Sequence, residues 1–332
     1  MFAENGTELG TVAVKRDWEP LYEFTRLHFL RRGELALDGD GGASVLPVWD
    51  GSVGEPYCRG YRMEIAQPGR RPVALEFPNR HFRDFARTVA SAFVEERRLA
   101  EGERFTYLVV AQQAPLEPRD DGGLQIKSIA SRTLIREGSL DGFLARATTH
   151  DAIDQGNLPV FVAAEVLEQA RSQTRCQEGT ETGGILIGSL WHDARSCEIF
   201  AEITAQIPAE HTAGTAVKLT FTPQTWAAAD AALRLRGRGE TYLGYWHSHP
   251  VRAWCKAKNC TLESQRVCRL ARDFFSADDE AVMRAAFPRA WCVGIVANDT
   301  AFADVTFSMF GNLEGTMQAR GFYILGEGSN GT

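Results

Sequence analysis

An apolar run, Thr241–Trp246, ends in His247-Ser248-His249-Pro250, and this junction limits what the chain can fold into more than any other stretch. The run is typical of a buried β-strand. Residues two apart on a strand project to the same side, so His247 and His249 face one point in space. Neutral imidazole is a common zinc ligand, and a catalytic zinc needs about three protein ligands with one position open for water. The strand end therefore predicts two ligands of a metal site, and the third must come from elsewhere in the chain.

The composition argues against several classes of protein. The formal charge is −7 and basic residues are scattered, whereas phosphate binding leaves a basic footprint, so we expect no nucleic acid as partner. No apolar run approaches the roughly 18–20 residues that cross a bilayer, and the first residues lack the pattern of a signal peptide. The seven cysteines are irregularly spaced, unlike a secreted disulfide framework. These features predict a cytoplasmic protein with no membrane partner.

The 332 residues suffice for two domains of roughly 100–200 residues each. A polar stretch at 148–157 predicts the boundary between an N-terminal α+β domain at 1–155 and a second domain at 156–332. In the first domain, apolar spacing predicts a helix over Asn79–Ala100 and strands over Tyr61–Ile65, Val73–Phe77 and Thr106–Ala111. No motif assigns this domain a role, and its position beside the second domain leads us to expect recognition of a substrate or partner.

Strands and helices alternate in the second domain. Helices are predicted over Ala163–Gln173, Thr225–Arg236 and Ala277–Ala286. Besides the strand that carries the histidines, strands are predicted over Gly184–Gly188, Glu198–Ile203, Val217–Phe221, Trp291–Val296, Ala303–Phe310 and Gly321–Leu325. This order predicts an α/β (α+β) fold with a curved mixed sheet packed between helices.

Ser276-Ala-Asp-Asp279 opens the last of these helices and offers a carboxylate as third ligand. Ser276 and Asp279 have the spacing of a capping box, in which hydroxyl and carboxylate close the start of a helix. The same spacing presents Asp279 at a helix end as a ligand, and the residues alone favour neither interpretation. Asp273 and Asp278 are competing carboxylates nearby.

A hydrolytic zinc also needs a general base that is not itself a ligand. Glu181 directly precedes a predicted apolar strand, where its carboxylate would lean over the edge of the sheet. A solvated glutamate within the polar stretch 177–182 is the competing interpretation.

Three motifs follow one another in the chain: Glu181-Thr-Gly-Gly, Tyr245-Trp-His-Ser-His-Pro250 and Ser276-x-x-Asp279. With the order of strands and helices, they resemble the JAMM (JAB1/MPN) metalloprotease family over about residues 160–310, whereas a lone His-x-His would be a weak signal. The resemblance implies a cytidine-deaminase-like JAB/MPN fold in which His247, His249 and Asp279 bind zinc. It also implies two catalytic residues, Glu181 as the base that activates water and Ser276 as a group that stabilises the oxyanion.

These roles agree with zinc chemistry. Zinc lowers the pKa of its water towards about 7 and polarises the scissile carbonyl, while a base takes the proton and returns it to the departing amine. Such family members cleave peptide or isopeptide bonds after the C-terminal glycines of ubiquitin or ubiquitin-like proteins, and this chain is similar to the prokaryotic JAB type. The resemblance implies deconjugation or precursor processing of a ubiquitin-like protein, with E1-like and E2-like partners of the same operon, in bacterial antiviral defence.

The sequence departs from the family between the second histidine and the serine. Twenty-six residues separate His249 from Ser276, where the family usually leaves about seven, which predicts an insertion at about 251–275. It contains Cys255, Cys260 and Cys268. These thiols either bind a second, structural zinc with a fourth ligand such as His211 or Cys292, or are ordinary thiols of a loop.

Two other functions stay open on the sequence. One is a non-catalytic MPN-type scaffold that binds partners through the same fold; such scaffolds typically lack part of the Glu, His, His and Asp set, which is complete here. The other is a zinc-stabilised protein-binding module centred on the cysteine-containing insertion.

Overall fold

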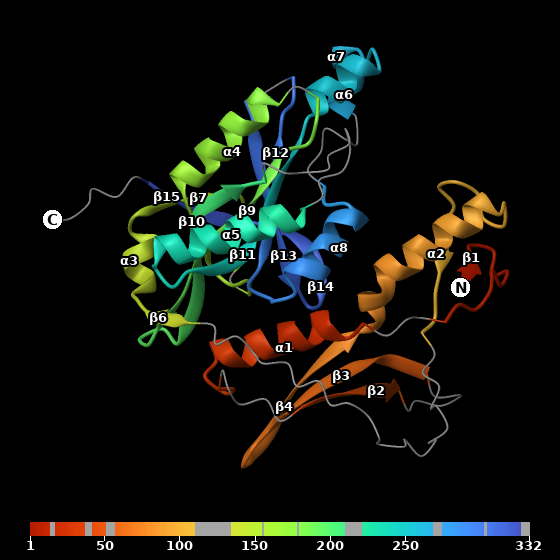
Figure 1. Ribbon diagram of the computed structural model, residues 1–332. Coiled ribbons are helices and arrows are strands. Elements are labelled where there is room, and N and C mark those ends of the chain that lie inside the picture. Colours follow the sequence, from red (N-terminus) through yellow and green to blue (C-terminus); the bar gives the residue numbers. More distant parts are fainter. Residues whose placement is uncertain are drawn as a thin grey trace. The chain divides into compact units, whose positions relative to one another are not determined.

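The computed structural model in Figure 1 describes residues 1–13, 17–36, 42–50, 57–109, 134–154, 156–177, 179–209, 221–267, 274–301 and 304–326. The chain divides into two units, Met1–Phe29 with Glu34–Arg132 and Leu30–Gly33 with Thr133–Thr332. Each unit contains its own clusters of buried hydrophobic residues.

The first unit contains a three-stranded antiparallel sheet of order β2-β3-β4. Leu21 of the first long helix packs with Met63 and Phe77 of the sheet in one of the core clusters of this unit. The predicted strands Tyr61–Ile65 and Val73–Phe77 lie within β3 and β4 and are confirmed. The elements of this unit are β1 (Phe2–Ala3), α1 (Glu19–Arg31), β2 (Ala43–Asp50), β3 (Tyr57–Gln67), β4 (Arg70–Pro78), η1 (Asn79–Phe82), α2 (Arg83–Glu95) and β5 (Phe105–Thr106).

The predicted strand Thr106–Ala111 is wrong for Tyr107, Leu108 and Val109, which form no strand. β5 ends at Thr106 because its partner β1 offers only two residues, and Phe2 pairs with Thr106 itself. Tyr107 instead donates its hydroxyl hydrogen to the backbone oxygen of Asn79. The end of this predicted strand, from residue 110, lies outside the described residues.

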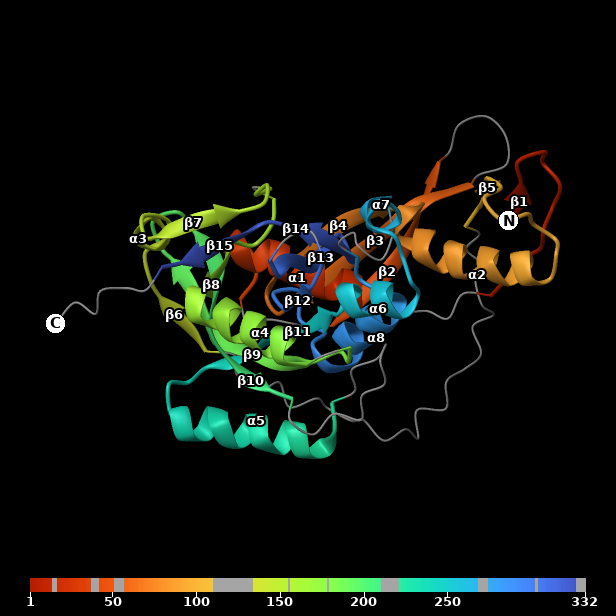
Figure 2. The ribbon, with the colours of Figure 1, turned by 90° about the horizontal axis from the view of Figure 1, so that it is seen from above.

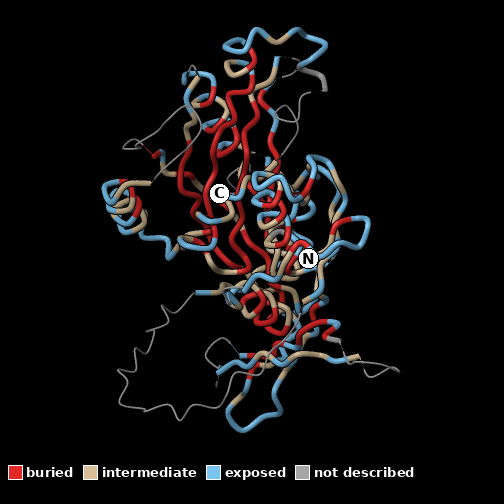
Figure 3. The backbone as a smooth tube through the Cα atoms, turned by 90° about the vertical axis from the view of Figure 1, so that its right-hand side faces the viewer, coloured by how far each residue is buried: buried red, intermediate tan, exposed pale blue. Residues whose placement is uncertain are grey.

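The second unit is built on one mixed sheet of ten strands among its described residues. The strand order is β14-β13-β12-β11-β9-β10-β8-β15-β7, and β6 pairs with β9 beside this path. Figure 3 shows the central strands of this sheet buried along most of their length. The strands are β6 (Ile135–Glu137), β7 (Ala147–His150), β8 (Val160–Ala163), β9 (Gly183–Asp193), β10 (Glu198–Pro208), β11 (Thr241–His249), β12 (Val293–Asn298), β13 (Thr306–Leu313), β14 (Thr316–Arg320) and β15 (Phe322–Leu325).

Helices cover both faces of this sheet (Figure 2). On one face, Trp246 of β11 donates to Gln206 of β10, whose amide contacts Gln169 of α4. On the other face, Tyr245 stacks on Phe287 at the end of α8. The sheet between helices confirms the predicted α/β architecture, while the cytidine-deaminase-like relationship stays a prediction. The helices are α3 (Leu140–Leu144), α4 (Ala164–Cys176), α5 (Pro223–Arg236), α6 (Val251–Ala257), α7 (Leu262–Val267) and α8 (Ala277–Ala286).

Most predicted elements of this unit are confirmed, and α8 has the predicted bounds. Of the predicted strand Val217–Phe221, only Phe221 is described. The described part of the predicted insertion contains two short helices, α6 and α7. Within the described residues, no helix combines the length and the apolar character that crossing a bilayer would require.

Candidate metal centre

β11 carries two histidines to its C-terminal end, and both side chains are buried. The strand is paired on both sides, antiparallel to β9 and parallel to β12, so His247 and His249 are only 1% and 2% exposed. Their alternation along the strand sends both rings to the face that also carries Tyr245. The two Nε2 atoms lie 3.0 Å apart, as the sequence led us to expect of a shared ligand position.

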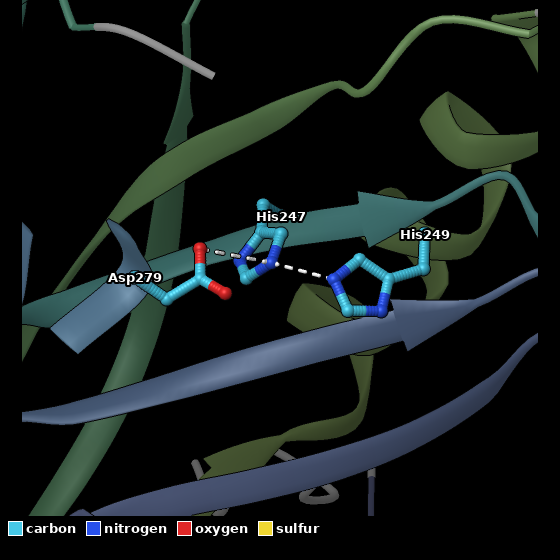
Figure 4. Close-up of side chains that lie close together, drawn as sticks. All are labelled: His247, His249 and Asp279. Carbon is cyan, nitrogen blue, oxygen red and sulfur yellow. Dashed lines mark hydrogen bonds and ion pairs between the residues drawn. The ribbon is translucent and has the colours of Figure 1, made fainter. Parts of the chain in front are cut away.

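α8 brings Asp279 to the same point. Its Oδ1 lies 3.4 Å from Nε2 of His247, and one ligand atom from each of His247, His249 and Asp279 lies within 4.8 Å of the others. Figure 4 shows the imidazole of His247 between the carboxylate of Asp279 and the ring of His249. The helix end and the strand end therefore converge on one buried position.

Asp279 serves as a helix cap and as a member of this cluster at once. Its Oδ2 accepts hydrogen bonds from the backbone N–H of Ser276 at 2.8 Å and from the Ser276 hydroxyl at 2.7 Å. The Ser276 oxygen in turn accepts from the N–H of Asp279 at 3.1 Å, which completes a capping box. Oδ1 is turned to His247. The two interpretations of the Ser276–Asp279 spacing are thus compatible, because each uses a different carboxylate oxygen.

Glu181 lies beside the histidines through the start of β9. Ser248 donates its backbone N–H to the oxygen of Thr182 at 2.8 Å, and the Ser248 hydroxyl oxygen accepts from the Thr182 N–H at 2.9 Å. The next residue of β9, Gly183, pairs with His247. Glu181 therefore directly precedes Thr182, which is hydrogen-bonded to Ser248 between the two histidines. Burial is the main cause that raises the pKa of Tyr245, and the charges of Asp279 and, to a smaller extent, Glu181 add to the shift. Glu181 therefore lies within electrostatic reach of the cluster.

The electrostatics favour neutral imidazoles. Burial lowers the pKa of His247, although the charge of Asp279 opposes the shift. Burial and the neighbouring His247 lower the pKa of His249 to about 3. Metal coordination requires neutral imidazole, so this environment keeps both histidines in the protonation state that a ligand needs.

The donor set fits a zinc ion. Zinc–nitrogen bonds of about 2.0–2.1 Å in a tetrahedral site place ligand atoms about 3.3 Å apart. Two of the three ligand-atom separations, 3.0 Å and 3.4 Å around Nε2 of His247, bracket that value, and the three atoms all lie within 4.8 Å of one another. Two imidazoles and one carboxylate also match the ligands of hydrolytic zinc sites, which keep a further position open.

Aromatic side chains surround the cluster, and no pattern in the sequence had predicted a role for them. Phe274 stacks on His249 with ring centroids 4.4 Å apart, and Phe275 lies 6.1 Å from His247. Tyr245 stacks on His247 at 5.5 Å and places its hydroxyl oxygen 3.3 Å from Oδ1 of Asp279. A period of two links Tyr245 to His247 along β11, and this was the signal that could have identified it.

The remaining predicted ligands that the structure describes are not part of this cluster. Asp278 is exposed on α8, and Asp273 lies outside the described residues. Cys255, Cys260 and Cys292 do not gather with other ligand atoms into a second group within the described part of the chain. The other candidates for a second zinc, Cys268 and His211, lie outside that part, so the structural zinc stays a prediction.

Residues 163–252 match the family described as prokaryotic homologs of the JAB domain. A solution structure of a protein from Desulfitobacterium hafniense aligns with 51% of this chain and 92% of its own length, with 15% identity and a TM-score of 0.36. No curated protein matches the chain. The matched segment contains Glu181, His247 and His249, and this part of the chain is similar to the prokaryotic JAB domains.

Proposed function

We propose that the chain is a zinc-dependent peptidase or isopeptidase that cleaves after the C-terminal tail of a ubiquitin-like protein. The observation that carries this proposal is the convergence of His247, His249 and Asp279 from a strand end and a helix start. The two Nε2 atoms face each other at 3.0 Å, and a carboxylate oxygen from the helix start lies 3.4 Å from one of them, so three donor atoms surround one buried position. The JAB match supports the proposal but does not decide catalysis by itself.

The proposed chemistry is hydrolysis of an amide. His247, His249 and Asp279 would hold the zinc ion, which when bound supplies a Lewis acid that polarises the scissile carbonyl and acidifies water. Glu181 would remove a proton from the attacking water as the new C–O bond forms. The same carboxylate would return that proton to the amine nitrogen as the C–N bond breaks.

Ser276 is the proposed donor to the oxyanion. In the structure its hydroxyl hydrogen is directed to Oδ2 of Asp279, with the two oxygens 2.7 Å apart. To act on substrate, the hydroxyl would have to rotate towards the oxyanion while its oxygen keeps accepting the Asp279 N–H. The backbone N–H of Ser276 would hold Oδ2 in the meantime.

The proposed substrate, a ubiquitin-like protein, also suggests how it is bound and which proteins act with this chain. An extended tail is recognised through main-chain hydrogen bonds beside a sheet, which would deliver its last carbonyl to a strand end. We place the protein in the cytoplasm, with E1-like and E2-like proteins of the same operon and a role in bacterial antiviral defence. The first unit would recognise the substrate or one of these partners.

The test is cleavage of a ubiquitin-like protein from the same gene neighbourhood that is fused at its C-terminus to a reporter. We expect release of the reporter by the wild-type chain, and loss of release with Glu181→Gln or a zinc chelator. Glu263→Gln, at an exposed glutamate in the first turn of α7, is the matched control and should cleave normally. Equal release by Glu181→Gln would exclude the proposed base. Binding of the fusion without any release would favour a non-catalytic scaffold.

A further inference from the structure

We propose that Tyr245 is a positioning residue that orients the carboxylate of Asp279 through its hydroxyl group and thereby sets the zinc affinity of the centre. The proposal rests on the metal site of the proposed function and extends it to a residue that makes no contact with the metal position itself.

The carboxylate of Asp279 is held from two sides. Ser276 supplies two donors to Oδ2. The Tyr245 hydroxyl lies 3.3 Å from Oδ1 and 3.3 Å from the backbone oxygen of Asp279, so that it shares its hydrogen between the two. Oδ1 is also the oxygen that faces His247. Tyr245 therefore acts on the atom that would bind zinc, whereas Ser276 acts on the other oxygen.

Tyr245 is itself held rigidly. It is 2% exposed, and its ring lies nearly parallel to both His247, at 5.5 Å and 18°, and Phe287, at 5.8 Å and 16°. Phe221 packs against it edge-on at 5.6 Å. Rotation of the ring away from Asp279 would require these partners to move. Tyr245 thus fixes the position of His247 by ring stacking and the position of Asp279 by a hydrogen bond from its hydroxyl group.

A group that orients a ligand changes metal affinity without touching the metal. Loss of such a partner typically lowers metal affinity or activity by about 10–100-fold. Tyr245→Phe removes one oxygen atom and keeps the ring and its stacking, so the core of the unit is preserved. We expect its zinc affinity to fall by about 10–100-fold.

Tyr242 provides a matched control on the same strand. Its hydroxyl also donates to a carboxylate on a helix, that of Asp230 on α5, and its ring packs edge-on against Trp226. Asp230 is not part of the metal cluster within the described residues. Tyr242→Phe removes the same kind of bond three residues away and should leave zinc affinity unchanged.

The experiment measures the zinc dissociation constant of the full chain by competition with a chromogenic chelator. Wild type, Tyr245→Phe and Tyr242→Phe are compared, after thermal unfolding of the metal-free proteins has shown that each is folded. The visible spectrum of the cobalt-substituted proteins provides a second readout, because it reports ligand geometry directly. We expect weaker zinc binding and an altered cobalt spectrum for Tyr245→Phe alone.

A double-mutant cycle separates orientation of Asp279 from a general effect on the fold. In an Asp279→Ala background, Tyr245→Phe should produce no further loss of zinc affinity, because the carboxylate it orients is absent. Equal zinc affinity of wild type and Tyr245→Phe, or an equal loss in both backgrounds, would overturn the proposal. If wild type binds no zinc, the proposed function itself fails, so the two failures are distinguishable.

Discussion

Asp279 lies three residues after Ser276, and that spacing suits both a helix cap and a ligand presented beside the helix start. The sequence could not choose, because it does not show how the two oxygens of one carboxylate are divided. In the structure Oδ2 closes the capping box and Oδ1 faces His247. Alternation along one strand was sufficient to predict that His247 and His249 face the same side. Tyr245 was missed because its role depends on the distance between a strand and a helix 34 residues further along the chain.

The cluster predicts which substitutions remove zinc. We expect about one zinc per chain in wild type, as for a single site with three protein ligands, and none in His247→Ala. His192→Ala is the matched control, since His192 contacts Glu137 away from the cluster. Atomic absorption on the purified proteins measures the metal content.

Substitution of the cysteines in the insertion tests whether the zinc is bound there instead of at the histidines. The variants Cys255→Ser and Cys260→Ser should bind as much zinc as the wild type, whereas the His247→Ala variant should bind none. Zinc that survives His247→Ala and disappears with the two serine substitutions would move the metal to the insertion. The protein would then be a zinc-stabilised binding module.

At the scale of elements, a bulge in β11 decides which residues face α5 and α8. The pairing with β9 shifts register between Tyr242 and Gly244. A bulge inserts one extra residue, so residues three apart can face the same side. Tyr242 and Tyr245 both contact this side, through Trp226 and Phe287. Gly244 adopts φ +135°, and a Cβ atom there would lie 1.8 Å from the backbone oxygen of Val293.

Gly244→Ala should therefore destabilise the second unit strongly. The backbone conformation costs about 1–3 kcal/mol for a residue with a side chain, and displacing Val293 costs about 1–3 kcal/mol more. Gly237→Ala is the control, because Gly237 also has positive φ (+59°) but its nearest atom is 4.0 Å away. It should cost about 1–2 kcal/mol. Urea unfolding measures both, and equal losses would show that the close approach to Val293 is relieved without cost.

A partly buried ion pair joins the end of α5 to the start of β11 and makes the stability of the fold depend on pH. The side chain of Glu240 is 2% exposed and that of Arg236 is 29% exposed. Glu240 accepts hydrogen bonds from Arg236 at 2.6 Å and 2.8 Å, and from the hydroxyl of Thr204. The hydrogen bond from Arg236 is the main cause that lowers the pKa of Glu240 below its ordinary 4.5. The folded state thus binds fewer protons at this site than the unfolded state, and the pair stabilises the fold above pH 4.5.

Glu240→Gln should cost about 1.5–3 kcal/mol of unfolding free energy at pH 7, because it removes hydrogen bonds to a charged group. The difference from wild type should shrink as the pH falls from 4.5, where Glu240 of the unfolded state becomes protonated, through the lower pKa of Glu240 in the folded state. Glu168→Gln, in the exposed pair with Arg171, should cost no more than about 1 kcal/mol. Urea titrations from pH 7 downward provide the measurement. A difference that stays constant with pH would contradict the assigned pKa shift.

The bounds of helices and strands with strong apolar periodicity could be predicted from the sequence. The bounds of elements that depend on contacts with another segment of the chain could not. α8 has the predicted bounds because Ser276 and Asp279 determine its start locally. β5 stops after Thr106 because β1 is two residues long, which no property of the segment Thr106–Ala111 reveals. α6 was missed because it is short. Its start is determined by the strand before it and by Arg252, whose N–H donates to the oxygen of Asp299 after β12.

At the scale of the whole molecule, two units with separate cores carry one metal centre. Met63 is 1% exposed in the core of the first unit, and Leu186 is 0% exposed in the sheet of the second. Units that have their own cores can unfold in separate transitions. The candidate ligands all belong to the second unit, since they lie on β11 and α8. Zinc should therefore stabilise only the second unit and shift only its unfolding transition.

Calorimetry of the full chain tests this prediction. A ligand that binds only the folded state at 100 times its dissociation constant adds about 2.7 kcal/mol of stability. Leu186→Ala and Met63→Ala should each lower the midpoint temperature of one transition, because each truncation costs about 2–5 kcal/mol of stability. Zinc should raise the midpoint temperature of the transition that Leu186→Ala lowers. It should leave the midpoint temperature of the other transition unchanged. His247→Ala should abolish the zinc response and retain both transitions. A zinc-dependent shift of the Met63 transition would mean that the metal also binds the first unit, or that the two units unfold as one.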